Sequence, residues 1–149
     1  EPWKRYVGED ENGVCICLTD EVRVTQADVR KIQLAKAPIA AGIQILLQEK
    51  DWKIKDIDQV ILAGGFGSYM RKESAAEIGL IPKELVKCTH SVGNAAGEGA
   101  VSAALASEAR TELEQLQKQM RYVELSTHEA FSDIFIREMS FTNSYMRSE

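Results

Sequence analysis

Two glycine-rich segments are the places in this sequence where residue types and spacing point to chemistry. The first reads Ala-Gly-Gly-Phe-Gly-Ser at residues 63–68, and the second reads Gly-Asn-Ala-Ala-Gly-Glu-Gly at residues 93–99. A strand that ends in glycines lets a phosphate or a planar base approach its backbone without meeting a Cβ. Backbone N–H groups and the Ser68 hydroxyl are the expected donors. Because each segment joins an expected strand end to a helix start, the two turns could converge on one ligand.

Both segments also have a structural interpretation, which the pattern leaves open. Three glycines can simply make a tight turn, and Gly97 and Gly99 with the alanines after them can allow close helix packing. At Gly65 we expect a positive φ, because the chain must turn sharply there. A dinucleotide fingerprint would need glycine where Met70 stands, and no Gly-x-x-x-x-Gly-Lys-Ser/Thr sequence occurs, so these two nucleotide motifs are disfavoured.

The three cysteines do not form a recognisable metal motif. Cys15 and Cys17 would share one face of a strand, but no second cysteine pair or His-x-His stands at a zinc or iron–sulfur spacing. We interpret both as buried packing residues. Cys88 and His90 would also share a strand face, yet without a third ligand they do not make a metal site.

Composition limits the class of protein. The 149 residues carry 18 basic and 23 acidic side chains, a net charge of −5, and 44% are hydrophobic. Such a chain has material for a core but no dense basic surface, so nucleic acid is an unexpected partner. No apolar run approaches the roughly 18–20 residues that span a bilayer. The chain starts without Met or a signal-peptide h-region, so we expect a fragment of a longer protein.

Strands and helices are expected to alternate along the chain. Apolar patterns predict strands at residues 14–18, 59–63, 86–92 and 122–125. A long amphipathic helix is predicted at 26–50, opened by a capping box of Thr25 and Asp28. Pro38 lies inside it, so the helix is either kinked or divided in two, and we expect a kink.

Three further helices are predicted. A short one at residues 74–78 ends at Gly79, and a small-residue helix follows Gly93 with an apolar stripe that continues to Met120. The last begins at a Ser126-x-x-Glu129 capping box and carries aromatic residues between 131 and 139. The tail from 142 to 149 is expected to fray. This order of elements predicts an α/β fold with a mostly parallel or mixed sheet.

The combination of motifs resembles the C-terminal part of the reductive activators of corrinoid proteins. These are ferredoxin-fused ATPases of the superfamily of acetate and sugar kinases, heat-shock chaperones and actin. The resemblance covers about residues 14–141 and is carried by the sequences at 24–36, 60–69, 78–82, 92–100 and 122–126. It implies part of an actin-like (ribonuclease H-like) ATPase domain, with a mixed sheet flanked by long helices, and it makes residues 1–149 the C-terminal nucleotide-facing lobe.

The resemblance also implies a function. The strand ending in Gly-Gly is similar to the family's adenosine motif, and residues 93–99 are similar to its second connecting motif. ATP with Mg²⁺ would lie between this lobe and a missing one, and an N-terminal [2Fe-2S] domain of the parent protein would deliver electrons. The partner would be a corrinoid protein or corrinoid methyltransferase in the cytoplasm, where cob(II)alamin is returned to cob(I)alamin. The implied ligand-binding residues are Gly64, Gly65, Gly67, Ser68, Asn94, Gly97 and Gly99.

The chain departs from the complete family pattern. It has no Asp-x-Gly-Thr phosphate motif and no ferredoxin cysteine set, and none of its residues is a convincing catalytic acid, base or nucleophile. We therefore expect the fragment alone to be inactive although its parent hydrolyses ATP. The alternative is a non-catalytic α/β module for dimerisation or partner docking, with the aromatic helix near residues 131–139 as its contact face. Homodimer formation is left open.

Overall fold

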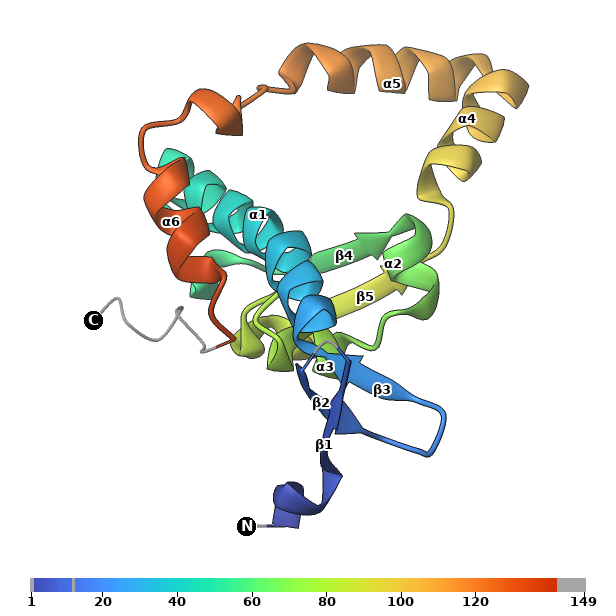
Figure 1. Cartoon of the computed structure of the whole chain (residues 1–149). Coiled ribbons are helices and arrows are strands. Elements are labelled where there is room, and N and C mark those ends of the chain that lie inside the picture. Colours follow the sequence, from blue (N-terminus) through green and yellow to red (C-terminus); the bar gives the residue numbers. More distant parts are fainter. Residues whose placement is uncertain (1, 12, 142–149) are drawn as a thin grey trace.

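The computed structural model describes residues 2–11 and 13–141, which form two small sheets and several long helices (Figure 1). The predicted frayed tail lies outside the described residues. The strands are β1 (Val7–Asp10), β2 (Gly13–Cys17), β3 (Arg23–Thr25), β4 (Val60–Ala63) and β5 (Thr89–Val92). The α-helices are α1 (Gln26–Lys50), α2 (Gly64–Tyr69), α3 (Lys72–Glu77), α4 (Ala95–Leu105), α5 (Ser107–Gln119) and α6 (Phe131–Glu138). Short 3₁₀ helices cover Pro2–Tyr6, Ile54–Asp56, Lys83–Cys88 and Leu125–Thr127.

The first sheet is antiparallel, in the order β1-β2-β3. Asp10 pairs with Gly13 at the hairpin end, and Gly13 has a φ of 105°, a conformation that favours glycine. The strand predicted at 14–18 is confirmed by β2. β3 was not predicted, because a strand of three residues is too short to show a clear period.

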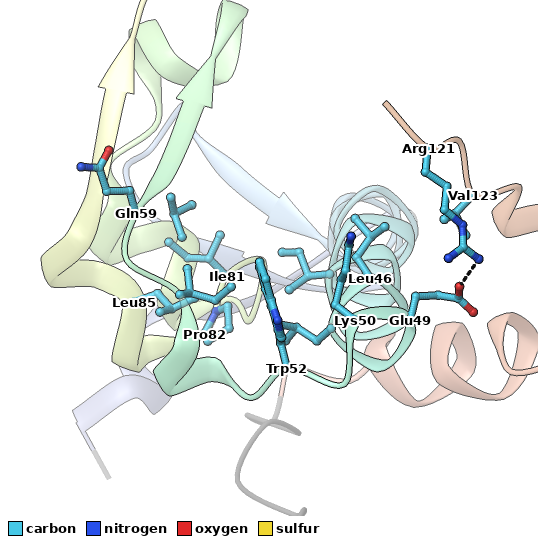
Figure 2. A pocket seen from close by; sticks show the side chains of 14 residues that line it. Leu46, Glu49, Lys50, Trp52, Gln59, Ile81, Pro82, Leu85, Arg121 and Val123 are labelled. Atoms are coloured by element: carbon cyan, nitrogen blue, oxygen red, sulfur yellow. Dashed lines mark hydrogen bonds and ion pairs between the residues drawn. The ribbon is translucent and has the colours of Figure 1, made fainter. Parts of the chain in front are cut away.

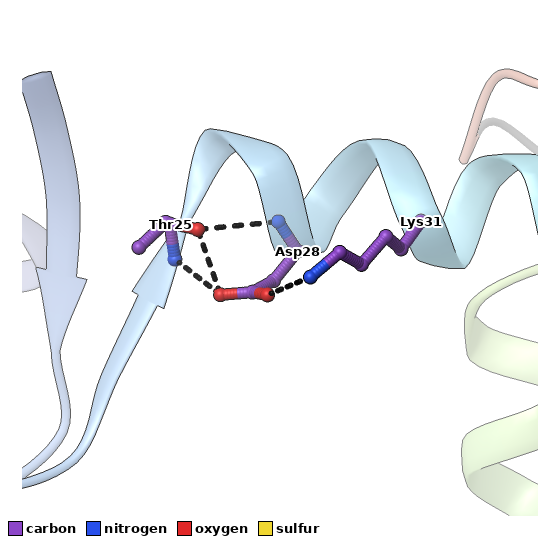
Figure 3. A network of polar contacts seen from close by, with 3 residues as sticks. All are labelled: Thr25, Asp28 and Lys31. Atoms are coloured by element: carbon purple, nitrogen blue, oxygen red, sulfur yellow. Dashed lines mark hydrogen bonds and ion pairs between the residues drawn. The ribbon is translucent and has the colours of Figure 1, made fainter. Parts of the chain in front are cut away.

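Helix α1 has the bounds that its sequence predicts. The Thr25 hydroxyl accepts a hydrogen bond from the amide of Asp28 at 3.2 Å, and the Thr25 amide donates to Asp28 Oδ2 at 3.1 Å (Figure 3). Lys31 Nζ lies 3.4 Å from Asp28 Oδ1. These bonds satisfy donors that a helix start leaves open, so the predicted capping box is confirmed. The helix ends at Asp51, which adopts the left-handed conformation.

Pro38 does not divide this helix. Residues 26–50 form one continuous α-helix, so the alternative of two helices is wrong. Ala41 and Ile45, beyond the proline, are completely buried against Ile134 of α6. This packing holds the second half of α1 in helical conformation although Pro38 lacks one backbone donor.

Helix α6 presents the predicted apolar stripe, but it starts differently. Its N-cap is Ala130, and the amide and hydroxyl of Ser126 both donate to the Glu124 carboxylate. The predicted Ser126–Glu129 capping box is therefore wrong. The strand predicted at 122–125 is also wrong, because this segment leads directly into the 3₁₀ helix Leu125–Thr127.

The second sheet pairs β4 and β5 in parallel, and Ala63 lies opposite Val92 at its end. The strand predicted at 86–92 is confirmed only from Thr89, because residues 86–88 belong to the 3₁₀ helix Lys83–Cys88 after Pro82. The Thr89 hydroxyl donates to the Leu85 carbonyl at 2.7 Å. Cys88 and His90 therefore do not share a strand face. β4 confirms the strand predicted at 59–63, but a short apolar run of this kind is typical of a buried strand, whereas Ile61 is 59% exposed.

Helices α4 and α5 form an arm that leaves the end of β5 and turns back towards α6 (Figure 1). The predicted helix is interrupted at Ala106, whose backbone is extended. No residue of either helix is buried. The close helix packing expected around Gly97 and Gly99 is thus not present among the described residues. Within these residues no helix combines the length and apolarity that a membrane crossing requires.

Candidate nucleotide-facing site

The two glycine-rich turns lie beside each other at the carboxyl ends of β4 and β5. The Gly64 amide donates to the Gly93 carbonyl at 2.8 Å, and the same oxygen accepts from the Ala95 amide at 3.0 Å. Parallel strands end at the same edge of a sheet, which is where ligands collect in α/β folds. The prediction that both turns leave the same edge is confirmed.

Gly64 and Gly67 have structural reasons to be glycine. Gly64 has a φ of 71°, so the sharp turn occurs there, and the expectation of a positive φ at Gly65 is wrong. The helix α2 begins immediately after β4, which places the left-handed residue first in the turn. A Cβ on Gly67 would collide with the Leu62 carbonyl and lie 2.5 Å from the Val92 carbonyl oxygen. Gly67 therefore lets α2 contact the ends of both strands.

Three other predicted site residues take part in local bonds. Asn94 is the N-cap of α4, and its Oδ1 accepts from the Gly97 amide at 3.1 Å. A Cβ on Gly97 would overlap the Asn94 side chain, so a substitution there would move that side chain from its present position. The Ser68 hydroxyl donates to the Gly64 carbonyl at 3.3 Å, within α2.

Gly65 and Gly99 remain without a local explanation. Neither has a positive φ, and a Cβ at either position would meet nothing within 4 Å. Glycine destabilises a helix relative to alanine by roughly 1 kcal/mol, so its presence in α2 and α4 calls for another cause. An open glycine backbone is the surface that a closely approaching ligand needs.

The titratable groups with shifted pKa values lie away from these turns in the described part of the chain. Hydrogen bonds from Thr25 lower the pKa of Asp28, and those from Ser126 and Tyr122 lower the pKa of Glu124. Burial lowers the pKa of Lys36. Because acid–base catalysts usually have perturbed pKa values, the turns are better suited to binding than to proton transfer.

An apolar groove lies at the other end of β4, near Val60, with a volume of about 410 Å³ (Figure 2). Ile81, Pro82 and Leu85 line one side, and Trp52 stands between them and α1. The Arg121 guanidinium pairs with the Glu49 carboxylate at 2.8 Å at the rim. Most of the lining is apolar, and of its two cations, Lys50 and Arg121, Arg121 is already paired with Glu49. We therefore take the glycine turns, with their open backbone, as the candidate nucleotide site.

Helix α6, the contact face that the docking alternative names, packs against α1 of the same chain. Ile134 is 4% exposed against α1, and Phe131 and Phe135 pack around the same cluster with ring centroids 5.8 Å apart. The aromatic side of α6 is thus packed against α1 within the chain, while Ile136 on the helix is 66% exposed.

Residues 5–148 match the family model described as the C-terminal domain of RACo, the ASKHA domain. The chain belongs to this family. The corrinoid activation enzyme RamQ of Eubacterium limosum is 32% identical over 97% of this chain. A solved structure of a reductive activator for corrinoid, iron–sulfur protein is 34% identical over 89% of this chain, with a TM-score of 0.77.

Membership of the RACo family confirms the α/β fold class of an actin-like domain. The chain spans only 26% of the length of RamQ and 22% of that of the solved activator.

Proposed function

We propose that this chain is the C-terminal nucleotide-facing lobe of an ATP-dependent reductive activator of corrinoid proteins. The observation that carries the proposal is the pair of glycine turns held together by the Gly64–Gly93 hydrogen bond, with Gly65 open beside it. The relatives support it, because both are named as activators of corrinoid systems.

In this proposal some residues of the turns contact the nucleotide and others hold the turns in place. Gly65 and Gly99 supply open backbone surface for the nucleotide, while Gly64 and Gly67 hold the turn against the strands. Ser68 stabilises α2 and keeps its hydroxyl at the same turn. The chain contributes binding surface rather than acid–base groups, and the metal ligands for Mg²⁺ come from the nucleotide phosphates and the preceding lobe.

Helix α4 connects the second glycine-rich turn to α5, the outer part of the arm. Asn94 and Gly97 fix its first turn beside Gly93, so a ligand that displaces this turn also displaces α4 and α5. A ligand shifts a conformational equilibrium only through its different affinities for the two states. Nucleotide contacts at the turn would therefore favour one position of the arm and change the affinity for the partner.

The parent protein would use this coupling for electron delivery. ATP with Mg²⁺ would supply the free energy of lobe closure, and a [2Fe-2S] domain would supply electrons. The partner would be a corrinoid protein or corrinoid methyltransferase whose cob(II)alamin is returned to cob(I)alamin, in the cytoplasm.

The test is ATP titration by calorimetry of the complete activator and its Gly65→Val variant. The Cβ of a valine at Gly65 would have no described atom of the chain within 4 Å, so the side chain would extend into the space assigned to the nucleotide. We expect ATP affinity to fall at least about tenfold, or roughly 1.4 kcal/mol, with little change in the thermal midpoint.

Ser132→Val is the matched control, because it places the same side chain at the exposed second position of α6, as Gly65 is the second residue of α2. This control should bind ATP as the parent does. A folded Gly65→Val protein with unchanged ATP affinity would show that the turn is only structural.

A further inference from the structure

Two thiols lie close together on β2. This strand precedes both glycine turns in the sequence and belongs to the other sheet. Cys15 and Cys17 point to the same face of the strand, as predicted, and their Sγ atoms are 3.9 Å apart. Both are free cysteines; Cys15 is 2% exposed and Cys17 is partly exposed. Cys17 is thus the more exposed residue of the pair, and Cys15 is the buried one.

The neighbouring strand leaves room for this pair. Gly8 of β1 lies opposite Cys15 in the register of the sheet. A Cβ built on Gly8 would be 2.7 Å from the Sγ of Cys17 and 3.7 Å from the Sγ of Cys15. A side chain at Gly8 would therefore push the Cys17 sulfur out of its present position. Simple packing of two small apolar residues does not require this space.

We propose that Cys15 and Cys17 form a reversible dithiol–disulfide pair. Residues i and i+2 of a strand have Cα atoms roughly 6.6 Å apart, which is near the upper limit of about 6.8 Å for a disulfide. Closure brings the sulfurs from 3.9 Å to bonding distance with a small contraction of β2. A bond formed under such strain is readily reduced, and this makes the pair reversible.

The oxidant is a low-molecular-weight disulfide. The Cys17 thiolate attacks one sulfur of this disulfide, which forms a mixed disulfide on Cys17 and releases one small thiolate. Cys15 then loses its proton and attacks the Cys17 Sγ, which forms the Cys15–Cys17 bond and releases the second small thiolate. Two protein thiols are oxidised, the external disulfide is reduced to two thiols, and the two protons pass to those thiolates through solvent.

The different burial of the two cysteines indicates which thiol attacks the external disulfide first. Burial, together with the hydrogen bond to Cys17, raises the pKa of the Cys15 thiol, so Cys15 is protonated at neutral pH. The more exposed Cys17 is the sulfur that an external disulfide can reach. Cys15 acts second, once the mixed disulfide has placed an electrophilic sulfur beside it.

Cys88 provides an internal control in the same chain. Its thiol donates to the Leu85 carbonyl at 3.3 Å within the 3₁₀ helix Lys83–Cys88, on a separate part of the fold. It has no role in the proposed reaction. Its alkylation therefore measures non-specific oxidation.

The experiment equilibrates the whole chain with a series of oxidised-to-reduced glutathione ratios, followed by acid quenching, alkylation in denaturant and peptide mass mapping. We expect the peptide with Cys15 and Cys17 to lose two hydrogen atoms and both alkyl groups as the ratio rises, while Cys88 stays alkylated. The Cys15→Ser variant should instead accumulate one glutathione on Cys17. Full alkylation of all three cysteines at every ratio would overturn the proposal.

Gly8→Ala tests the geometry without removing a sulfur. The added Cβ displaces the Cys17 Sγ, so we expect the disulfide-to-dithiol ratio at equal glutathione ratio to fall about tenfold, which corresponds to roughly 1.4 kcal/mol. If the alanine variant does not fold, the glutathione adduct of Cys15→Ser still decides the question. A Cys15→Ser protein that never forms an adduct would show that Cys17 is not the attacking thiol.

Discussion

The amide of Gly64 donates a hydrogen bond to the carbonyl oxygen of Gly93 at 2.8 Å. This bond extends the pairing of β4 and β5 by one step beyond Ala63 and Val92. It joins two turns that are far apart in sequence into one continuous backbone surface. The proposed nucleotide-facing site is this surface rather than a set of side chains.

Gly67 is expected to be the least tolerant residue of the first turn for folding. In Gly67→Ala the new Cβ would collide with the carbonyl groups of Leu62 and Val92 at the ends of both strands. We expect the free energy of unfolding to fall by about 1–3 kcal/mol, as for other overpacked positions. Urea denaturation followed by circular dichroism measures this change.

Gly99→Ala is the opposite case. Gly99 lies inside α4 with open space around it, so alanine gains helix propensity without a clash. The free energy of unfolding should rise by roughly 0.5–1 kcal/mol in the same urea experiment. Destabilisation by Gly99→Ala would contradict the open environment that the structure gives this residue.

Thr25 begins the longest helix of the chain. The change Thr25→Ala removes the hydroxyl that accepts from the Asp28 amide, and we expect a loss of about 1 kcal/mol in the free energy of unfolding. Thr25→Ser keeps the acceptor and should recover most of the loss. Equal destabilisation by serine and alanine would show that the hydroxyl is not what matters.

The pH dependence of stability should report the carboxylate of the same cap. Hydrogen bonds from Thr25 hold the pKa of Asp28 below its ordinary value, so the folded state binds this proton less readily than the unfolded state. The resulting stabilisation is complete above the unfolded pKa of about 3.9 and is lost as pH falls through the lower folded pKa. Asp28→Asn should flatten the acid limb of a stability–pH curve, and an unchanged limb would contradict this assignment.

Two buried charged residues connect α1 to α6 and the segment after it. Lys36 is 2% exposed and donates to the Ser140 carbonyl at 2.6 Å, while Glu138 is 1% exposed and accepts from Gln44 at 2.6 Å. Burial lowers the pKa of Lys36, and the charge of Glu138 acts in the opposite direction. Each charge therefore makes the burial of the other less costly.

Lys36→Met should lower the free energy of unfolding by about 2 kcal/mol, because it removes the buried donor to the Ser140 carbonyl and the positive charge that acts on the Glu138 carboxylate. The double variant Lys36→Met with Glu138→Leu should recover most of that loss. Urea denaturation of the two variants measures the difference. If the single variant is as stable as the parent, the two charges do not depend on each other.

The sequence predicted a structural feature correctly where the interacting residues lie close together in the sequence. The bounds of α1 were predictable because Thr25 and Asp28 cap the helix three residues apart and the apolar stripe continues through Pro38. The common face of Cys15 and Cys17 followed from the two-residue period of a strand. Both glycine turns were predictable as strand ends.

Predictions failed where another bond competed with the local pattern. Ser126 resembles the start of a capping box, but its amide and hydroxyl bond to Glu124, so the helix starts later. Residues 86–88 alternate like a strand, yet the hydrogen bond from Thr89 to Leu85 holds them in a 3₁₀ helix. Periodicity does not reveal which of two acceptors a side chain will choose.

The sequence by itself therefore determined the bounds of helix α1, the positions of the glycine turns at strand ends, and the common strand face of Cys15 and Cys17. The tertiary structure alone decided that the turns adjoin, that Gly64 rather than Gly65 takes the positive φ, and that Gly67 touches both strands. These facts depend on carbonyl groups of Leu62, Val92 and Gly93 brought together by parallel pairing. Their positions follow from the sheet, because no local pattern specifies which backbone atoms meet across two strands.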